Sequence, residues 1–458
     1  MSKYGDKLST AEAIAALVKD GMWIDYGGIQ SPRAFDRALA QRVGKLKNVK
    51  VRCIGHLMLP QVMEKDPEGK SFWWGNWHIL GYTRKYIAEN RGQHIPQNFG
   101  ETARYYREDI AIDMAVINTT PMNKHGYFNF GLVNAFTKAT IEKAKIKVVE
   151  VNESMPWCYG GYDECIHLSD VDYVIENKED QIGVIPTPPS TDTDMKIAEI
   201  IADMIPKNAP CLQIGIGGLP DTILRLLADH GVQDIGIHTE MVTEAIAELH
   251  DAGLITGKKK TFLPNKIVYA FSLGSRKLYD WLDHNPSLAS YPVDFTNDPN
   301  VIALQKNLVS INACLGVDLQ GQVSSESLGL AEYSGTGGQL AFARGAYYRS
   351  TKGLPPFGYS DNKSIIAMYS TYTKDGRLMS RINPTLPLGE IVTVPRVDVS
   401  YLVTEYGVAY LKGLSVPERA LAIIKIAHPE FRDWLKEEAV KMKWLNKQWA
   451  LGGIGGKA

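Results

Sequence analysis

The chain has 458 residues, enough for two domains, and its 45% hydrophobic and 22% charged residues are typical of a globular protein. Its 50 Lys and Arg against 51 Asp and Glu leave a net charge of −1, which argues against a nucleic-acid-binding protein. It has no run of 18 apolar residues and no signal-peptide pattern at its start, and its five cysteines form no CxxC pair. We therefore expect a cytoplasmic protein with no bound metal and with neither a membrane nor a nucleic acid as partner.

The first part of the chain predicts a helix, a strand and a second helix. TAEAIAALVKDG (10–21) has its apolar residues at helical spacing, and Ser9 and Glu12 have the spacing of a capping box. WIDYGG (23–28) predicts a strand that ends in a double-glycine turn, and SPRAFDRALAQRV (31–43) predicts the second helix.

A proline-rich stretch interrupts the chain near residues 185–195. Proline fixes its own φ and favours extended backbone in the residue before it, so this stretch predicts a linker. Its prolines are Pro186, Pro188 and Pro189. We place the boundary there and predict an N-terminal domain of residues 1–188 and a C-terminal domain of residues 189–458.

The order of elements repeats after the linker. Residues 194–205 predict a helix, CLQIGIGG (211–218) a strand with a double-glycine turn, and LPDTILRLLADHG (219–231) a helix. The repeat predicts two related halves. Strands that alternate with helices favour mostly parallel sheets with helices on their faces, so we expect an α/β protein built of two open α/β domains.

The turn formed by Gly215, Gly217 and Gly218 lies between a predicted strand and a predicted helix. Glycines there let a ligand approach the backbone, and a helix N-terminus favours an anion, although a plain tight turn needs the same residues. Pro220 occupies the third glycine position of a dinucleotide fingerprint. The turn therefore predicts an anion site or a structural turn rather than an NAD site.

Glu240 follows a short predicted strand and precedes a helical pattern that begins at Met241. Ligands of open α/β sheets bind at the carboxyl ends of strands, which makes Glu240 a candidate site residue. The alternative is that it only complements the helix dipole. His238 and Glu240 match the HxE of zinc deaminases, but no downstream PCxxC supplies the remaining ligands.

Three further segments are candidates without a decided role. SGTGGQLAFARGA (334–346) places glycines before a predicted helix, and Lys363 starts a predicted strand. The third segment, residues 72–78, contains three tryptophans, namely Trp73, Trp74 and Trp77. Such a cluster is typical of packing or of a subunit interface, and the alternative is the wall of an acyl site.

Several motifs occur together and in order. They are INTTPMNKHGYFNFG (117–131), QIGIGGLPDTIL (213–224), IHTEMV (237–242), VSINACLGVDLQGQVSSE (309–326), SGTGGQLAFARGA (334–346) and the closing segment of residues 380–432. This set resembles the acetyl-CoA hydrolase/transferase branch of the family I CoA-transferases, the group of the 4-hydroxybutyrate and butyryl-CoA:acetate CoA-transferases. The match is specific in the second half of the chain and looser in the first.

The resemblance implies a role for each matching position. Glu240 corresponds to the catalytic glutamate, the Ile216 N–H to an oxyanion donor, and Asn312 to the residue that orients bound carboxylates. The positions that correspond to CoA contacts are Gly217, Gly218, Leu219, Pro220, Asp221, Gly337, Gly338 and Lys363. His56 stands where a second nucleophile would be expected in the first half, so we expect one active site per chain.

The family's chemistry implies a ping-pong transfer of coenzyme A through a glutamyl-CoA thioester. Glutamate suits this step because its ordinary pKa leaves it ionised at neutral pH. CoA would be a substrate, with no permanently bound cofactor, and we expect a homodimer or a larger homo-oligomer. Hydrolysis of acyl-CoA on the same scaffold is the first alternative, and an NAD-dependent oxidoreductase is the second.

Overall fold

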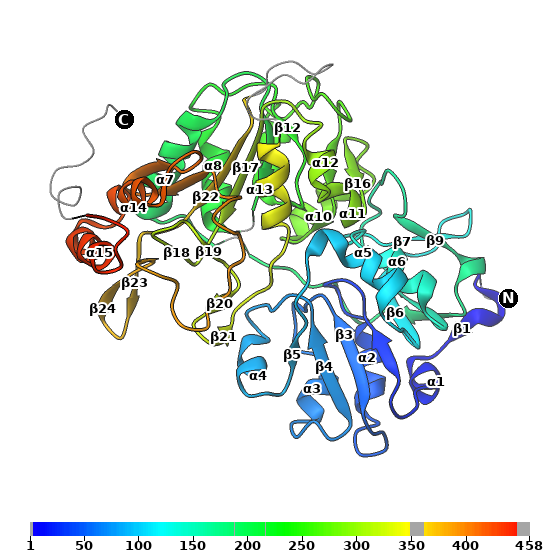
Figure 1. Ribbon diagram of the computed structural model, residues 1–458. Coiled ribbons are helices and arrows are strands. Elements are labelled where there is room, and N and C mark those ends of the chain that lie inside the picture. The colour runs from blue at the N-terminus through cyan, green and yellow to red at the C-terminus, as the bar shows by residue number, and fades with distance from the viewer. Residues whose placement is uncertain (1–2, 187, 216, 349–360, 447–458) are drawn as a thin grey trace.

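The computed structural model describes residues 3–186, 188–215, 217–348 and 361–446. We call the part before residue 187 the N-terminal half and the part after it the C-terminal half. Each half forms a sheet flanked by helices, and the two halves pack side by side, one in blue and cyan and the other in green to red (Figure 1). The predicted α/β class with mostly parallel sheets is confirmed.

The N-terminal half contains an eight-stranded sheet that is parallel throughout. In spatial order its strands are β1 (Leu8–Ser9), β10 (Tyr173–Asn177), β8 (Ile146–Asn152), β6 (Met114–Thr119), β2 (Trp23–Asp25), β3 (Val49–Cys53), β4 (Phe72–Asn76) and β5 (Gln93–His94). Its α-helices are α1 (Ala11–Ala16), α2 (Arg33–Ala40), α3 (Gln61–Lys65), α4 (Arg84–Ala88), α5 (Thr102–Arg104) and α6 (Thr137–Lys143), and β7 (Tyr127–Asn129) pairs with β9 (Cys165–His167). Every residue of β6 is buried, as in a parallel strand covered on both faces.

The C-terminal half contains a six-stranded sheet in which only the last pair is antiparallel. In spatial order its strands are β12 (Gly236–Ile237), β11 (Cys211–Ile214), β17 (Leu308–Ala313), β22 (Lys363–Ala367), β26 (Tyr401–Thr404) and β27 (Gly407–Tyr410). The helices are α7 (Asp192–Met204), α8 (Gly218–Leu226), α9 (Glu244–Asp251), α10 (Arg276–Leu282), α11 (Val293–Thr296), α12 (Pro299–Ile302), α13 (Gln339–Tyr347), α14 (Val416–Lys425) and α15 (Pro429–Lys441). Short pairs surround this sheet: β13 (Met241–Val242) with β15 (Phe271–Ser272), β14 (Ile267–Tyr269) with β16 (Leu288–Ser290), and β20 (Ser327–Leu328) with β21 (Ala331–Glu332). The others are β18 (Gly316–Asp318) with β19 (Val323–Ser324) and β25 (Ile382–Asn383), and β23 (Thr371–Lys374) with β24 (Arg377–Ser380).

The two sheets share a strand order. In each half the first strand of the repeated unit lies inside the sheet: β2 lies between β3 and β6, and β11 lies between β12 and β17. The next strand of the sheet in chain order, β3 or β12, lies on one side of it, and a later strand, β6 or β17, lies on the other. Both sheets therefore have a switch point, the place at which ligands bind in open α/β folds. The common order supports the prediction of two related halves.

The first helix is capped by a residue other than the predicted one. The Thr10 side chain accepts a hydrogen bond from the Ala13 N–H at 3.2 Å, whereas Ser9 belongs to β1. Because Ser9 is part of a parallel ladder with β10, its backbone continues the strand and the helix starts one residue later. The capping-box prediction for Ser9 was wrong.

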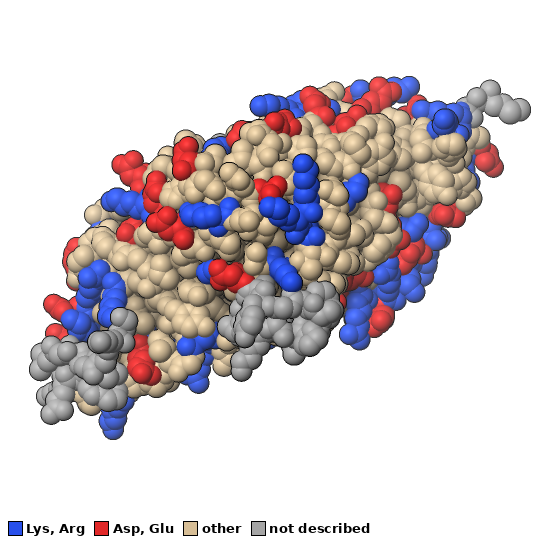
Figure 2. All heavy atoms as spheres, turned by 90° about the horizontal axis from the view of Figure 1, so that it is seen from above, with Lys and Arg blue, Asp and Glu red and all other residues tan. Residues whose placement is uncertain are grey.

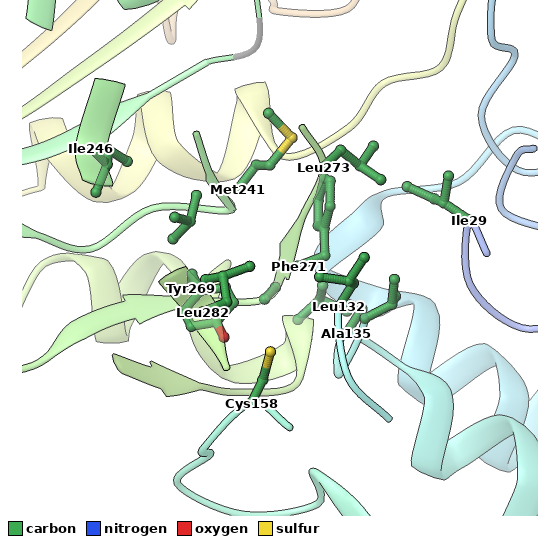
Figure 3. Close-up of a cluster of buried hydrophobic side chains, with 14 of the residues drawn as sticks. Ile29, Leu132, Ala135, Cys158, Met241, Ile246, Tyr269, Phe271, Leu273 and Leu282 are labelled. Carbon is green, nitrogen blue, oxygen red and sulfur yellow. The ribbon is translucent and has the colours of Figure 1, made fainter. Parts of the chain in front are cut away.

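One hydrophobic core joins the two halves. Phe99 of the N-terminal half packs edge-on against Phe271 of the C-terminal half, with ring centroids 5.9 Å apart. The Ala135 N–H donates to the Ala270 carbonyl at 3.1 Å across the same boundary. Figure 3 shows Ile29 pointing toward Leu273 from the opposite half. Because these residues are buried together, the halves form a continuous packed boundary, which we call the seam.

The tryptophan-rich segment belongs to the packing of the N-terminal half. Trp74 is buried against His56, with ring centroids 4.6 Å apart, and Trp77 donates from Nε1 to the Tyr106 hydroxyl at 2.9 Å. Trp73 packs edge-on against Trp23. The packing interpretation is therefore confirmed for these three side chains.

The surface carries charges of both signs. Figure 2 shows Lys and Arg mixed with Asp and Glu over the face that it presents. Within the described residues, no helix combines the length and the apolar character needed to cross a membrane.

Candidate active site

Glu240 lies at the seam, between β12 and β13. Its carbonyl oxygen accepts hydrogen bonds from the Ala270 N–H at 2.9 Å and from the Phe271 N–H at 3.1 Å. These bonds hold the main chain of Glu240 against the start of β15, which packs against the N-terminal half. The expectation that a helix begins at Met241 was wrong, since Met241 and Val242 form β13 and α9 begins at Glu244.

The Glu240 carboxylate has two protein donors. Its Oε2 accepts from Nδ2 of Asn297 at 2.6 Å, and the Gly338 N–H also donates to the carboxylate. Asn297 is oriented by Thr296, whose Oγ1 donates to its Oδ1 at 2.9 Å. Gly338 caps the N-terminus of α13, so the helix end that faces this carboxylate is that of α13 rather than α9.

A side chain at position 338 would displace the groups around Glu240. A Cβ atom there would overlap both Oε2 of Glu240 and Nδ2 of Asn297. The neighbouring Gly337 has φ near +57°, a left-handed conformation that L side chains rarely adopt. The predicted glycine turn therefore lies directly against the predicted nucleophile, although 98 residues separate Glu240 from Gly338.

Burial changes the ionisation of Glu240. It raises the pKa of the carboxyl from 4.5 to about 7, and the hydrogen bonds from Asn297 and Gly338 only partly offset this effect. The sequence-based expectation of a fully ionised glutamate at neutral pH is thus modified: ionised and protonated forms are comparably populated near pH 7.

Two cavities flank Glu240. The first, which we call the apolar cavity, has a volume of about 60 Å³. Its apolar wall combines Ile29, Ile54, Leu80 and Phe99 of the N-terminal half with Phe271 and Leu273 of the C-terminal half. The second, the polar cavity, has a volume of about 220 Å³ and contains Gly215, Asn312, Gly337 and Gly338. His78 lines both cavities.

A network of polar side chains forms one wall of the polar cavity. Asn312 donates from Nδ2 to Oε1 of Gln213 at 3.0 Å, and Gln213 donates from Nε2 to Oδ1 of Asn312 at 3.2 Å. The Ser310 hydroxyl donates to the same Gln213 oxygen at 2.6 Å. β11 and β17 bring these residues together at the switch point of the sheet, so the amide of Asn312 is fixed beside Glu240.

The other predicted glycine turn, which contains Gly217 and Gly218, lines a third cavity of about 350 Å³, which we call the loop cavity. Gly217, Gly218, Leu219 and Pro220 lie along it, opposite Pro188 and Pro189 of the linker. Ala313 lines both this cavity and the polar cavity, so the two are neighbours. Ile216, the predicted oxyanion donor, lies outside the described residues.

Two predicted CoA contacts do not line these three cavities. Asp221 is buried within α8. Lys363 pairs with Val309 at the amino end of β22, whereas Asn312 pairs with Ile366 nearer the carboxyl end. Lys363 also forms an ion pair with Asp361 at 2.5 Å. Their contacts with CoA stay predictions.

Sequence reasoning missed Asn297, Gln213 and His78. Asn297 follows the short helix α11, and no pattern in the sequence marks it. Gln213 and His78 follow the general rule that polar residues at the carboxyl ends of strands are site candidates. Gln213 is the residue before the last one of β11, and His78 follows the end of β4. A groove of about 960 Å³ lies elsewhere in the N-terminal half, against α1 and α2, and contains none of the predicted site residues.

Known proteins resemble this chain over most of its length. Residues 1–186 match the N-terminal domain model of acetyl-CoA hydrolase/transferase, and residues 274–439 match its C-terminal domain model. The chain is 44% identical to a probable butyrate:acetyl-CoA coenzyme A-transferase of Syntrophomonas wolfei, covering 99% of each chain. It is 42% identical to a butyryl-CoA:acetate CoA-transferase of Anaerostipes caccae, covering 96% of this chain and 97% of that one.

A solved structure is also similar. RipA from Yersinia pestis superposes with a TM-score of 0.84 at 33% identity, covering 96% of this chain and 99% of that one. Both family models and the full-length relatives converge on one assignment. This chain belongs to the acetyl-CoA hydrolase/transferase family.

Proposed function

We propose that this protein transfers coenzyme A between a short-chain acyl-CoA and a free carboxylate, with Glu240 as the nucleophile. The observation that carries the proposal is the position of the Glu240 carboxylate between a small apolar cavity and a polar cavity that adjoins the glycine turn at 217–220. An acyl chain and the polar CoA moiety thus each have a matching space beside one carboxylate.

The reaction begins when a carboxylate oxygen of Glu240 attacks the thioester carbonyl carbon. The C–S bond breaks, CoA leaves as a thiolate, and an acyl-glutamyl anhydride remains. The thiolate then attacks the glutamyl carbonyl of the anhydride and displaces the first acid as a carboxylate. The resulting glutamyl-CoA thioester reacts with the incoming carboxylate by the reverse steps, so no net proton is consumed.

Each addition places negative charge on a carbonyl oxygen, which needs hydrogen-bond donors at fixed positions. The Asn297 amide and the Gly338 N–H already bind the glutamate side of the reaction. Asn312, whose amide N–H groups are held by Gln213 and Ser310, lines the polar cavity and would position the carboxylate bound there. A donor held in advance stabilises the developing charge without reorganisation.

The volume of the apolar cavity sets the size of the acyl group. The cavity has a volume of about 60 Å³ and an apolar wall, which suits a short acyl chain. The names of the two relatives, which include butyrate, butyryl-CoA, acetate and acetyl-CoA, describe acids of this size. The CoA moiety would extend from Glu240 through the polar cavity toward the loop cavity.

The test is chemical trapping. Incubation with acetyl-CoA alone, followed by borohydride and mass spectrometry, should show the reduced form of the peptide that contains Glu240 and a loss of activity. The Glu240→Ala variant should lose transfer and show no modification. An unmodified Glu240 peptide, or full activity of the variant, would contradict the proposal.

Hydrolysis is separated from transfer by one further measurement. CoA release from acetyl-CoA is followed with and without added butyrate. A transferase holds the CoA on Glu240 or passes it to butyrate and so releases no free CoA, whereas a hydrolase releases free CoA continuously with or without butyrate.

A further inference from the structure

His78 lies at the junction of the two cavities that flank Glu240. It comes from the N-terminal half, where it follows the carboxyl end of β4, whereas Glu240 comes from the C-terminal half. The side chain is partly exposed, toward the cavities that it lines.

The main chain around His78 is fixed on both sides of the seam. The His78 N–H donates to the Ile54 carbonyl at 2.7 Å, and the Ile79 N–H donates to the Ser334 carbonyl at 3.2 Å. A Cβ at Gly335 would approach Nδ1 of His78 to 2.9 Å, so the absence of a side chain at 335 makes room for the imidazole. The imidazole is therefore held against the segment that continues to Gly337 and Gly338, beside Glu240.

The ring has an unused donor and an unused acceptor. Among the hydrogen bonds of the described residues, none involves either ring nitrogen of His78. Neither nitrogen is among the buried side-chain atoms that lack a hydrogen-bond partner. Burial, together with the smaller effects of the charges of His94 and Arg84, lowers the pKa of His78 to about 4, so the ring is neutral. A neutral imidazole carries one N–H donor and one lone-pair acceptor.

We propose that His78 is a further catalytic residue, which donates a hydrogen bond to the oxygen of the acyl carbonyl that reacts with Glu240. This inference rests on the proposed function. When the glutamate oxygen bonds to the carbonyl carbon, the π electron pair moves to the carbonyl oxygen, and the imidazole N–H binds that oxygen until the C–S bond breaks. No proton is transferred, because a ring that is neutral at physiological pH acts as a hydrogen-bond donor throughout.

The position of His78 supports this role over a structural one. A structural histidine would use its ring nitrogens within the protein, as His238 does with the Thr296 carbonyl at 3.0 Å. The His78 ring instead borders the space where the acyl group meets Glu240. The N-terminal half would thereby complete an active site whose nucleophile lies in the C-terminal half.

The test compares three variants in the full-length protein. His78→Phe removes the donor but keeps a ring of similar size, and His78→Gln retains an amide N–H at a similar distance from the main chain. His94→Phe is the matched control, because His94 contacts Glu332 across the seam and lines neither cavity. The readouts are kcat, KM for acetyl-CoA, melting temperature and the single-turnover rate of glutamyl-CoA formation.

We expect His78→Phe to lower kcat and the single-turnover rate by about 10²–10³-fold with little change in KM, which is the effect of losing one oxyanion donor. His78→Gln should have a kcat at least about tenfold higher than that of His78→Phe, and His94→Phe should keep near wild-type kcat. Equal rates of His78→Phe and wild type, or equal losses in the Phe and Gln variants, would overturn the role of His78.

A failure of this inference is distinguishable from a failure of the proposed function. If wild-type protein forms the glutamyl-CoA thioester while His78→Phe forms it at the same rate, only the role of His78 is wrong. If the wild-type protein forms no thioester at all, the proposed function itself is wrong.

Discussion

At the scale of single residues, the environment of Glu240 reconciles two opposing demands. In the proposed reaction, burial keeps water away from a reactive anhydride, but it disfavours the charged form of Glu240 that attacks the thioester. Two hydrogen bonds, from Asn297 and from the Gly338 N–H, partly stabilise the carboxylate. The net result is a raised pKa, which makes the reactivity of this residue dependent on pH in the neutral range.

The first prediction concerns that pH dependence. Because only the ionised carboxylate attacks, kcat/KM should rise with pH and level off above an apparent pKa of about 7. Initial rates with acetyl-CoA and butyrate between pH 5 and pH 9, a range of roughly two units either side of that value, would measure it. A flat profile across this range would show that the pKa of Glu240 lies outside it.

The second prediction concerns stability. The folded-state pKa of Glu240 is raised above 4.5, so the ionised carboxylate destabilises the fold, and wild-type stability falls as pH rises from about 4.5 to about 7. Glu240→Gln has no such group and should exceed wild type by up to about 3 kcal/mol above pH 7, with the advantage shrinking toward pH 4. Denaturant unfolding of both proteins at pH 4 and above pH 7 would show whether the variant is the more stable one and whether its advantage is smaller at pH 4.

The third prediction concerns Gly338. Gly338→Ala adds a Cβ that would overlap the Glu240 carboxylate and the Asn297 amide, so kcat should fall by at least about a hundredfold. Gly81→Ala is the control, because a Cβ there meets nothing within 4 Å. Comparable kcat values for the two variants would contradict the described contact.

At the scale of elements, helix and strand ends decide where the site lies. β11 and β17 end at the switch point of the sheet and deliver Gln213 and Asn312, while the N-terminus of α13 delivers Gly338. The end of β4 delivers His78 from the other sheet. The sequence predicted most of these elements but misplaced two helix starts, at Ser9 and at Met241, because in both places backbone pairing extended a strand into the expected helix.

The fourth prediction tests one of those helix starts. Thr10→Ala removes the side-chain acceptor for the Ala13 N–H and should cost about 1 kcal/mol of unfolding free energy. Ser9→Ala removes no cap and should change stability by less than about 0.5 kcal/mol. The two variants should leave kcat unchanged, and a larger cost for Ser9→Ala would restore the capping box predicted from the sequence.

At the scale of the whole molecule, the proposed active site lies where the two halves meet. The N-terminal half supplies Ile29, Ile54, Leu80 and Phe99 to the apolar cavity, and the C-terminal half supplies Glu240 with Phe271 and Leu273. The shared core explains how the small cavity keeps its shape, since close-packed side chains hold it from both sides. Under the proposed function, the seam sets the specificity for acyl length.

The fifth prediction concerns that specificity. Phe99→Leu enlarges the apolar cavity from the N-terminal side and should raise the ratio of kcat/KM for hexanoyl-CoA over butyryl-CoA by about tenfold, since each methylene accommodated contributes roughly 1–3 kcal/mol. Melting temperature would control for the loss of ring packing against Phe271. An unchanged ratio in a folded variant would place the acyl group elsewhere.

The sequence by itself determined the α/β class, the repeated order of elements, both glycine turns and the identity of the candidate nucleophile. These depend on short-range patterns and on motifs that are contiguous in the chain. Tertiary structure alone decided which residues bind that nucleophile. Asn297 lies 57 residues from Glu240, and His78 belongs to the other sheet. No local pattern encodes such contacts. Tertiary structure also set the pKa of Glu240, because desolvation depends on all the groups that surround the carboxyl rather than on its neighbours in sequence.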